Sequence, residues 1–358
     1  MIKKNYPKIL FLATFFLLIT KVNAQNLYAG IEIGSKGLKV YVVDIKDAAK
    51  GLFEIKENWS TNLDLQRGIM YDGELLNRDI ESTGKKIQND YNKLTKELKV
   101  DISKISVVIS SGVSIAKNVN ELVLKVKSVT KNEPVVVNSI QESKLMFKGA
   151  VNLKNYKDSF AIDIGGGNTK GGFVEMDGAK INFKDFNIDI GTVALSEMMY
   201  KKSKTYKVDE FINSLNNYIP TLNEDFKKIF NSYPTISDKK KIYLTGGATW
   251  AFFTLFNGVG AKETISEFKF ADVLTYNDFI QNNFSKFKTL ALTDKEVDKV
   301  LNTYSQENLI AANAILLSTL QNISKVESKK LYFAKQPQTA WMITFMLDTA
   351  NKTEIGKL

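Results

Sequence analysis

The 358-residue sequence contains no cysteine and no histidine, and these two absences exclude much of the chemistry that enzymes commonly use. Without cysteine there are no disulfides and no thiol nucleophile. Without histidine there is no Ser-His-Asp triad. A zinc site of the usual Cys/His type is also impossible. Any catalysis must therefore depend on carboxylates, hydroxyls, lysines, backbone amides or a hard metal ion bound by oxygen.

Arginine is scarce as well, because Arg67 and Arg78 are its only occurrences and the remaining basic residues are lysines. The formal net charge is +10, and the lysines are scattered along the chain. A solvated lysine-rich surface is the favoured interpretation, and weak attraction for polyanions is the alternative. No basic stripe is interleaved with aromatic residues, so we expect no nucleic-acid partner.

The first residues have the pattern of a targeting segment. Lys3, Lys4 and Lys8 precede the apolar run Ile9–Ile19, and Ala24 offers a small residue for cleavage. This pattern predicts a cleavable secretory signal peptide over residues 1–24, and hence an exported protein, periplasmic or secreted. An uncleaved N-terminal anchor is the alternative. No other stretch is long and apolar enough to cross a membrane, so we expect no membrane span after cleavage.

Hydrophobic periodicity predicts strands alternating with helices through most of the chain. The expected strands are 27–33, 38–44, 105–110, 134–137, 160–164, 169–175, 180–183, 241–244 and 330–333. The expected helices are 75–98, 114–129, 140–151, 193–200, 208–230 and 338–350. Each half opens with a strand, a glycine turn and a second strand. The pattern predicts two α/β domains, 25–145 and 146–358, with a cleft between them and a mostly helical C-terminal part.

The glycine turns are the main candidates for a binding site. A loop with few Cβ atoms lets backbone N–H groups approach a phosphate and point at its oxygens. The second turn has this character, and Asp163 before it could hold a hydrated divalent cation. The first turn repeats the idea after Glu32. The candidate phosphate-binding residues are Gly34, Ser35, Lys36, Gly165, Gly166, Gly167, Asn168, Thr169, Lys170, Gly246 and Gly247.

Each of these features also has a structural interpretation. One glycine hairpin alone is as often a tight turn as a binding loop, and the matched pair strengthens the second interpretation. Lys36 is equally compatible with a phosphate contact and with solvent. Lys39 is expected to be solvated. Trp250 could line a base pocket, but packing within an aromatic helix is favoured.

The two glycine turns and the segments around them resemble the motifs of a known family. The segment YAGIEIGSKGLKVYVVDI (28–45) is similar to the first phosphate loop of the exopolyphosphatase and guanosine pentaphosphate phosphohydrolase (Ppx/GppA) family. AIDIGGGNTKGGFVE (161–175) is similar to the second loop, usually written DIGGGSTE. Further similar segments follow in family order: 110–126, 139–151, 186–197 and 242–255. The resemblance implies two ribonuclease H-like domains of the actin-like ATPase kind, with a phosphate-binding cleft between them.

The resemblance also implies roles for single residues. Glu142 matches the acid that acts as general base on the attacking water; an ordinary solvated helix acid is the alternative. Glu32 and Asp163 match the metal site, and Mg²⁺ is the implied cofactor. The sequence departs from the family pattern at several places: Glu32 replaces an aspartate, Asn168 a serine and Ser114 an arginine, and the segment Gln336–Met342 replaces a late family motif. Lys170 replaces the acid that closes DIGGGSTE, and it could bind a phosphate oxygen directly or pair with Asp163. The resemblance further implies a homodimer and a phosphate-chain ligand such as polyphosphate.

Three functions remain open on these grounds. The first is an exported, Mg-assisted phosphoanhydride hydrolase with Glu142 as base. The second is a catalytically impaired phosphate- or nucleotide-binding relative, which Lys170 and Ser114 motivate. The third is a kinase or filament-type ATPase, which the export signal disfavours because ATP should be scarce outside the cytoplasm. We favour the first by a small margin.

Overall fold

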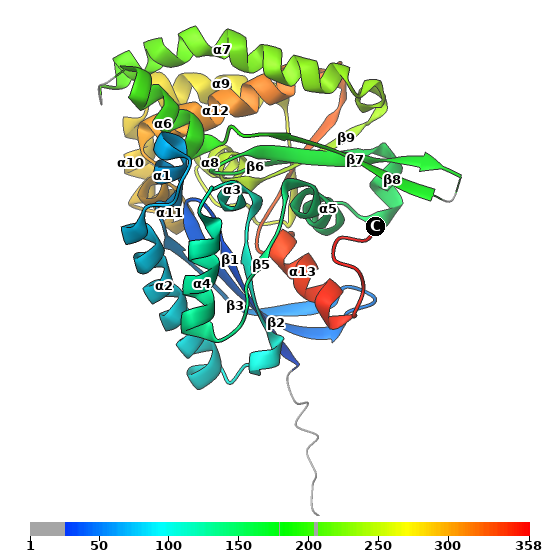
Figure 1. Cartoon of the computed structure of the whole chain (residues 1–358). Coiled ribbons are helices and arrows are strands. Elements are labelled where there is room, and N and C mark those ends of the chain that lie inside the picture. The colour runs from blue at the N-terminus through cyan, green and yellow to red at the C-terminus, as the bar shows by residue number, and fades with distance from the viewer. Residues whose placement is uncertain (1–25, 179, 204–206) are drawn as a thin grey trace, which may run out of the picture.

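The computed structural model describes residues 26–178, 180–203 and 207–358 as two β-sheets, each covered by helices (Figure 1). The first sheet is built from the N-terminal part of the chain, and the second from the part after residue 158. The predicted α/β class with two sheets is therefore confirmed. The predicted signal peptide, 1–24, lies outside the described residues.

The first sheet has the strand order β3-β2-β1-β4-β5. Its strands are β1 (Leu27–Ile33), β2 (Gly37–Asp47), β3 (Leu52–Asn62), β4 (Ile105–Ile109) and β5 (Val135–Val136). β1 pairs antiparallel with β2 and parallel with β4, so the hairpin turn after β1 lies at the carboxyl end of the sheet. Helices α2 (Asn77–Asn92) and α4 (Val119–Thr130) cover one face. Their buried residues Ile80, Ile87, Leu122 and Val126 recur at helical spacing.

The second sheet has the order β10-β11-β9-β6-β7-β8. Its strands are β6 (Ser159–Ile164), β7 (Thr169–Asp177), β8 (Lys180–Ile188), β9 (Lys241–Thr245), β10 (Ile265–Phe268) and β11 (Lys330–Ala334). Its helices are α6 (Thr192–Ser203), α7 (Val208–Asn231), α8 (Gly246–Asn257), α9 (Phe270–Asn282) and α12 (Gln306–Gln321). Figure 1 shows α7, α9 and α12 stacked above this sheet, where they enclose the largest hydrophobic core.

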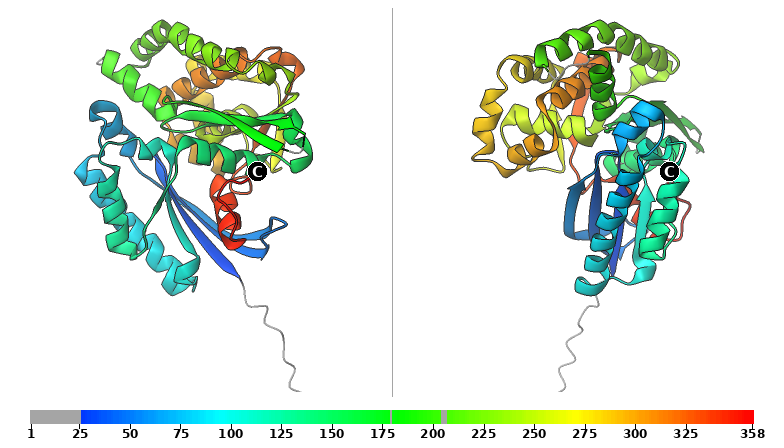
Figure 2. Two further views of the ribbon diagram at one scale, coloured as in Figure 1. Left: turned by 45° about the vertical axis from the view of Figure 1, so that its right-hand side comes forward. Right: turned by 60° about the vertical axis from the view of Figure 1, so that its left-hand side comes forward.

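Two helices lie between the sheets. α5 (Ser139–Ala150) packs against β6, β7 and β8, and α13 (Trp341–Ala350) packs against α5 and against β1 (Figure 2). Their apolar side chains form one buried cluster that takes in Val43 from the first sheet and Ala161 from the second. The expected boundary between residues 145 and 146 falls inside α5. The last helix lies on the first sheet although the sequence grouped it with the second domain.

The remaining elements are short. They are α1 (Leu65–Asp72), α3 (Ser111–Ser114), α10 (Ser285–Ala291), α11 (Lys295–Thr303), a π turn (Lys93–Glu97) and four 3₁₀ turns (Ile102–Lys104, Leu153–Asp158, Pro234–Asp238, Val326–Ser328). The expected helix 114–129 begins five residues later than predicted, at the start of α4, because residues 115–118 form a break between α3 and α4. The side chain of Asn118 bonds both the N–H and the carbonyl of Leu75, so a tertiary contact fixes the break.

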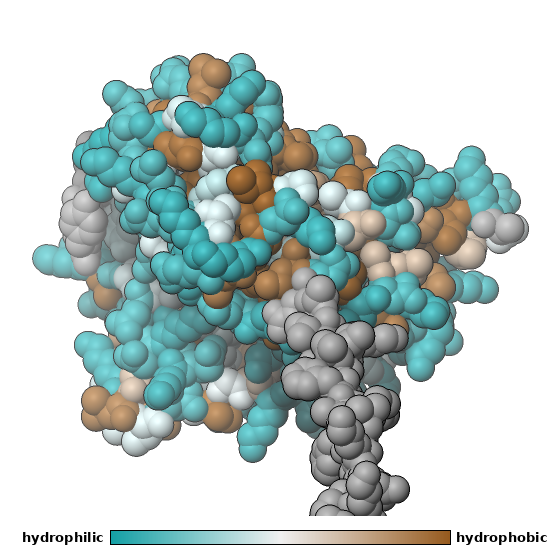
Figure 3. All heavy atoms as spheres, turned by 90° about the horizontal axis from the view of Figure 1, so that it is seen from below, coloured by the Kyte–Doolittle hydropathy of each residue, from teal (hydrophilic) through white to brown (hydrophobic). Residues whose placement is uncertain are grey.

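Two strands were missed by the sequence analysis. β3 and β10 are both edge strands, and β3 has no fully buried residue. A strand without a buried face lacks the hydrophobic alternation on which such predictions depend. No helix within the described part of the chain is long and apolar enough to cross a membrane. Figure 3 shows hydrophilic and hydrophobic side chains interspersed on the face seen from below.

Candidate functional site

The two glycine turns have the same geometry and touch each other across the cleft. In the first, the N–H of Gly34 donates to the carbonyl of Gly37 at 3.0 Å; in the second, the N–H of Gly165 donates to the carbonyl of Asn168 at 3.0 Å. A Cβ added to Gly166 would lie 2.7 Å from Ser35 Oγ. The two loops therefore approach closely here, and a side chain at position 166 would displace the hydroxyl of Ser35.

A cavity of about 630 Å³ opens where these loops meet. The predicted site residues that line it are Glu32, Gly34, Ser35, Lys36, Glu142, Asp163, Gly165, Gly166, Gly167, Asn168, Lys170, Gly246 and Gly247. Thr169 is an exception, because its buried hydroxyl donates to the carbonyl of Ile190 at 2.8 Å instead of facing the cavity. Ser114 also lies outside the lining, and its hydroxyl donates to the carbonyl of Ser111 at 3.2 Å.

Lys170 lies at the centre of the site with 2% of its surface exposed. Its Nζ is 2.7 Å from Asp163 Oδ2, 2.9 Å from Glu142 Oε1 and 3.2 Å from Asn168 Oδ1. Burial alone would lower the pKa of Lys170, but the charges of Asp163 and Glu142 outweigh it and hold the pKa above its ordinary value. An ammonium has three N–H donors, and these three contacts use all of them. Of the two roles expected for Lys170, contact with a phosphate oxygen and pairing with Asp163, the structure shows the pairing.

Glu142 is buried, with 3% of its surface exposed, so it is not the solvated helix acid that was the alternative. It stands in the first turn of α5, and its Oε2 accepts from the N–H of Ser111 at 2.8 Å. Ser111 Oγ in turn accepts from Asn168 Nδ2 at 3.0 Å. Asn168 Oδ1 and Glu142 both accept from Lys170, so these four residues form a ring of hydrogen bonds. The ring joins β7 and the loop before it to α5 and α3.

The first hairpin repeats the acid–lysine pairing of the second. Lys39 Nζ lies 3.2 Å from Glu32 Oε1, and Lys39 lines the cavity with 39% of its side chain exposed. The expectation that Lys39 would be solvated and outside the site is corrected by this position. Burial raises the pKa of Glu32, against the opposing charge of Lys39, with Glu142 and Asp163 adding to the rise.

These two pairs occupy equivalent places in their hairpins. Glu32 faces Lys39 across β1 and β2, and Asp163 faces Lys170 across β6 and β7. Each lysine follows its acid by seven residues in the sequence. This repeated spacing on either side of a glycine turn is the signal that could have identified Lys39 as a site residue.

The residues present do not fit the Mg²⁺ that the resemblance implies. In the described ranges, no group of three or more acidic side chains is placed to hold a metal ion. The carboxylates of Asp163 and Glu142 share the ammonium of Lys170, and Glu32 is paired with Lys39. A divalent cation prefers several oxygen ligands at 2.0–2.6 Å, and here a second positive charge would have to enter beside two lysines.

The outer part of the cavity contains Trp250, for which the sequence left a pocket role and a packing role open, and other residues that the sequence did not mark. All three tryptophans of the chain line it, and Trp250 does so while packing against the largest hydrophobic core, that of the second sheet. Lys299, Lys335 and Tyr304 add polar groups. Behind the second loop, the amide of Gln66 is fully buried without a hydrogen-bond partner among the described residues, close to Gly167. These residues come from distant segments, and no local motif marks them.

Comparison with known proteins agrees with this architecture. The model of the Ppx/GppA phosphatase family matches residues 42–238, more than half of the chain. No curated protein sequence matches this chain. The similarities to solved structures have sequence identities below 25%, so they concern the fold alone. One similar solved structure is a Ppx/GppA family member from Aquifex aeolicus, with 19% sequence identity, a TM-score of 0.62 and coverage of 91% of this chain and 98% of that chain. A second is an exopolyphosphatase from Cytophaga hutchinsonii, with 14% identity, a TM-score of 0.69 and coverage of 92% and 100%. A third is an exopolyphosphatase-like protein, with 14% identity, a TM-score of 0.73 and coverage of 92% and 98%. The predicted two-domain, ribonuclease H-like (actin-like) architecture is thereby confirmed.

Proposed function

The chain belongs to the Ppx/GppA phosphatase family, and on this premise we propose that it hydrolyses the terminal phosphoanhydride bond of polyphosphate or a related phosphate chain. The observation that carries the proposal is the place of Glu142. Its buried carboxylate faces the cavity at the point where both glycine loops meet, and its position is fixed by Ser111 and Lys170.

In this proposal the loops bind and Glu142 activates water. Backbone N–H groups around Gly34 and Gly166 donate to the terminal phosphate, and Lys36 and Lys39 offset its charge. A water molecule next to Glu142 attacks the terminal phosphorus and gives its proton to the carboxylate. The bridging P–O bond breaks, which releases orthophosphate and a chain shorter by one phosphate. Such transfers depend mainly on positioning and on stabilisation of charge.

The proposed location is outside the cytoplasm, as the sequence pattern over residues 1–24 suggests. There the substrate would be an exported or released phosphate chain. Because an ATP pool is not expected in that location, we do not propose a kinase or a filament-type ATPase.

A second candidate function is supported by one specific observation. Both carboxylate oxygens of Glu142 already accept a hydrogen bond, one from Lys170 and one from Ser111. A carboxylate so engaged is a weaker acceptor for the proton of water. The protein would then hold a phosphate chain without cleaving it, as a binding relative of the family.

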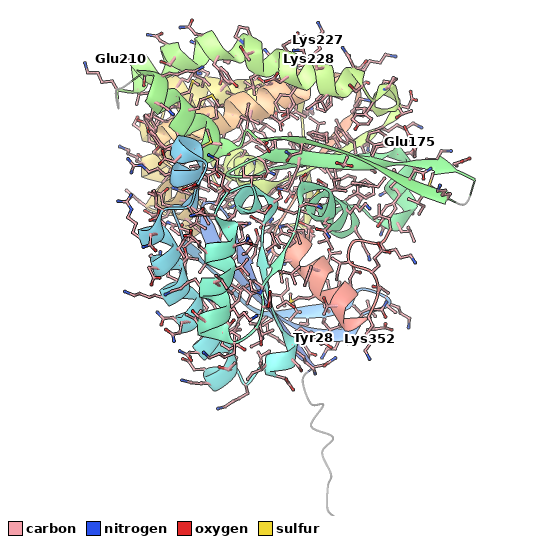
Figure 4. All side chains as sticks on the ribbon, in the orientation of Figure 1. Tyr28, Glu175, Glu210, Lys227, Lys228 and Lys352 are labelled. Carbon is pink, nitrogen blue, oxygen red and sulfur yellow. The ribbon has the colours of Figure 1, made fainter. Side chains whose placement is uncertain are left out.

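Orthophosphate release by the purified protein separates the two functions. Long-chain polyphosphate and a panel of nucleotides would be tested with the natural protein, with Glu142→Gln and with Glu210→Gln. Glu210 is an exposed acid at the start of α7, remote from the cavity (Figure 4). Release that disappears only in Glu142→Gln would support hydrolysis. No release, together with a melting temperature raised by polyphosphate, would reject hydrolysis in favour of binding.

A further inference from the structure

The two acid–lysine pairs suggest how this site works without the family's metal. We propose that Lys170 and Lys39 are built-in cations that replace the divalent cation, so that the site takes up condensed phosphate without a metal ion. The inference rests on the proposed function for its ligand class, but its central test does not require turnover.

The position of Lys170 is the first argument. Its ammonium lies between Asp163 and Glu142, at 2.7 and 2.9 Å from their oxygens, and it is almost fully buried. A buried carboxylate is strongly disfavoured unless it is paired. A divalent cation that entered here would remove the lysine from both partners. The fixed ammonium therefore takes the place that a metal would have between these carboxylates: it offsets part of their charge and fixes their distance.

The two lysines have different tasks because their donors are used differently. All three N–H groups of Lys170 point at protein oxygens, so this residue has none for a ligand. Among the described residues Lys39 forms an ion pair with Glu32, and 39% of its side chain, which lines the cavity, is exposed. It keeps donors for a phosphate oxygen. Lys170 is thus a positioning residue that holds Glu142, and Lys39 is the cation that contacts the ligand.

The charge of the cavity wall agrees with a metal-free site. Lys36, Lys39 and Lys170 balance Glu32, Glu142 and Asp163 at the loops. Farther out, Lys299 and Lys335 outnumber Glu296. A phosphate chain would enter a wall with a small positive excess, and it would not need a metal to cancel the repulsion from the carboxylates.

Thermal melting with MgCl₂ alone, without phosphate, is the central experiment. We expect no shift in melting temperature for the natural protein between excess MgCl₂ and EDTA. In Lys170→Glu, which restores the acid of the family pattern, MgCl₂ should raise the melting temperature, because three carboxylates then face one another. Lys184→Glu, the same change at a half-buried position of the neighbouring strand β8 outside the cavity, should not respond to MgCl₂.

Calorimetric titration with tripolyphosphate is the second measurement and keeps the test decisive if Lys170→Glu does not fold. The affinity of the natural protein in EDTA should equal or exceed that in MgCl₂, since Mg²⁺ also binds tripolyphosphate in solution. Lys39→Met should lower this affinity about tenfold, or by roughly 1.4 kcal/mol.

Two results would overturn the inference: stabilisation of the natural protein by MgCl₂ alone, or tripolyphosphate binding that is lost in EDTA. Failure of the proposed hydrolysis would look different. It would leave the MgCl₂ melts and the EDTA affinity as expected, with no orthophosphate released.

Discussion

Lys170 faces Asp163 across the β6–β7 hairpin, with its Nζ 2.7 Å from Asp163 Oδ2, and from there it also reaches Glu142 on α5. One side chain thus links a strand pair of the second sheet to the helix between the sheets. The family pattern has an acid at this position, so the lysine changes the charge of the site. The position itself remains buried. Four predictions follow from this arrangement and from its counterpart in the first hairpin.

Lys170→Met should destabilise the protein by about 3–5 kcal/mol, since it leaves two buried carboxylates without their partner. The pKa of Lys170 lies above its unfolded value, so the stabilisation is present at neutral pH and is lost only as the pH rises through the raised pKa. Urea denaturation at several pH values near neutrality measures this loss. Lys227→Met, on the outer surface of α7 (Figure 4), is the control and should change stability little. Equal stability of both variants would contradict the prediction.

Lys39→Met should lower the free energy of unfolding at neutral pH, but by less than Lys170→Met, because it leaves one buried carboxylate, Glu32, without its partner instead of two. Its effect should appear in ligand binding, where the loss of a cation next to the loops weakens the hold on phosphate. Titration calorimetry with tripolyphosphate checks this, beside Lys184→Met as a lysine outside the cavity. If the two variants bind equally well, Lys39 does not contact the ligand.

Glu32→Gln should raise the melting temperature at neutral pH. The folded-state pKa of Glu32 lies above its unfolded value, chiefly through burial, and its Oε2 has no partner among the described residues. For such a group, the stability contribution is complete below the unfolded pKa and falls as the pH rises through the folded pKa. The gain should therefore vanish at acid pH, where the natural side chain is protonated.

The matched control for this prediction is Glu54→Gln, which removes an exposed acid of β3. Melting curves of both variants over a range of pH give the comparison. A gain in Glu32→Gln that persists unchanged in acid would mean that ionisation of Glu32 is not its cause.

Gly166→Ala should weaken tripolyphosphate binding, since the new methyl group would lie 2.7 Å from Ser35 Oγ and would displace that hydroxyl where the two loops meet. Gly51→Ala is the control. Gly51 has a φ of +66° in a turn with open space around it, so alanine there costs roughly 1–2 kcal/mol of stability without touching the cavity. Calorimetry should show a binding loss in the first variant only. A binding loss in both would point to general destabilisation.

The local features of the fold were predictable. The hairpins around the glycine turns follow from two apolar strands joined by a short turn, and the buried strands β4, β6 and β9 follow from continuous apolar runs. The edge strands β3 and β10 could not be predicted in this way, because their stability comes from hydrogen bonds to a neighbouring strand that the sequence does not mark. The position of α13 against β1 likewise depends on a contact between opposite ends of the chain.

The features of the site can also be separated into those that the sequence determines and those that depend on the tertiary structure. The sequence by itself determined the two glycine hairpins, each with an acid before its turn, because a hairpin's turn and register are local properties. Only the tertiary structure decided which groups pair across that cleft. Glu142 reaches Ser111, 31 residues away, and shares Lys170 with Asp163. The charge state of the site depends on this packing of distant segments, since a buried charge is set by the neighbours that burial brings to it.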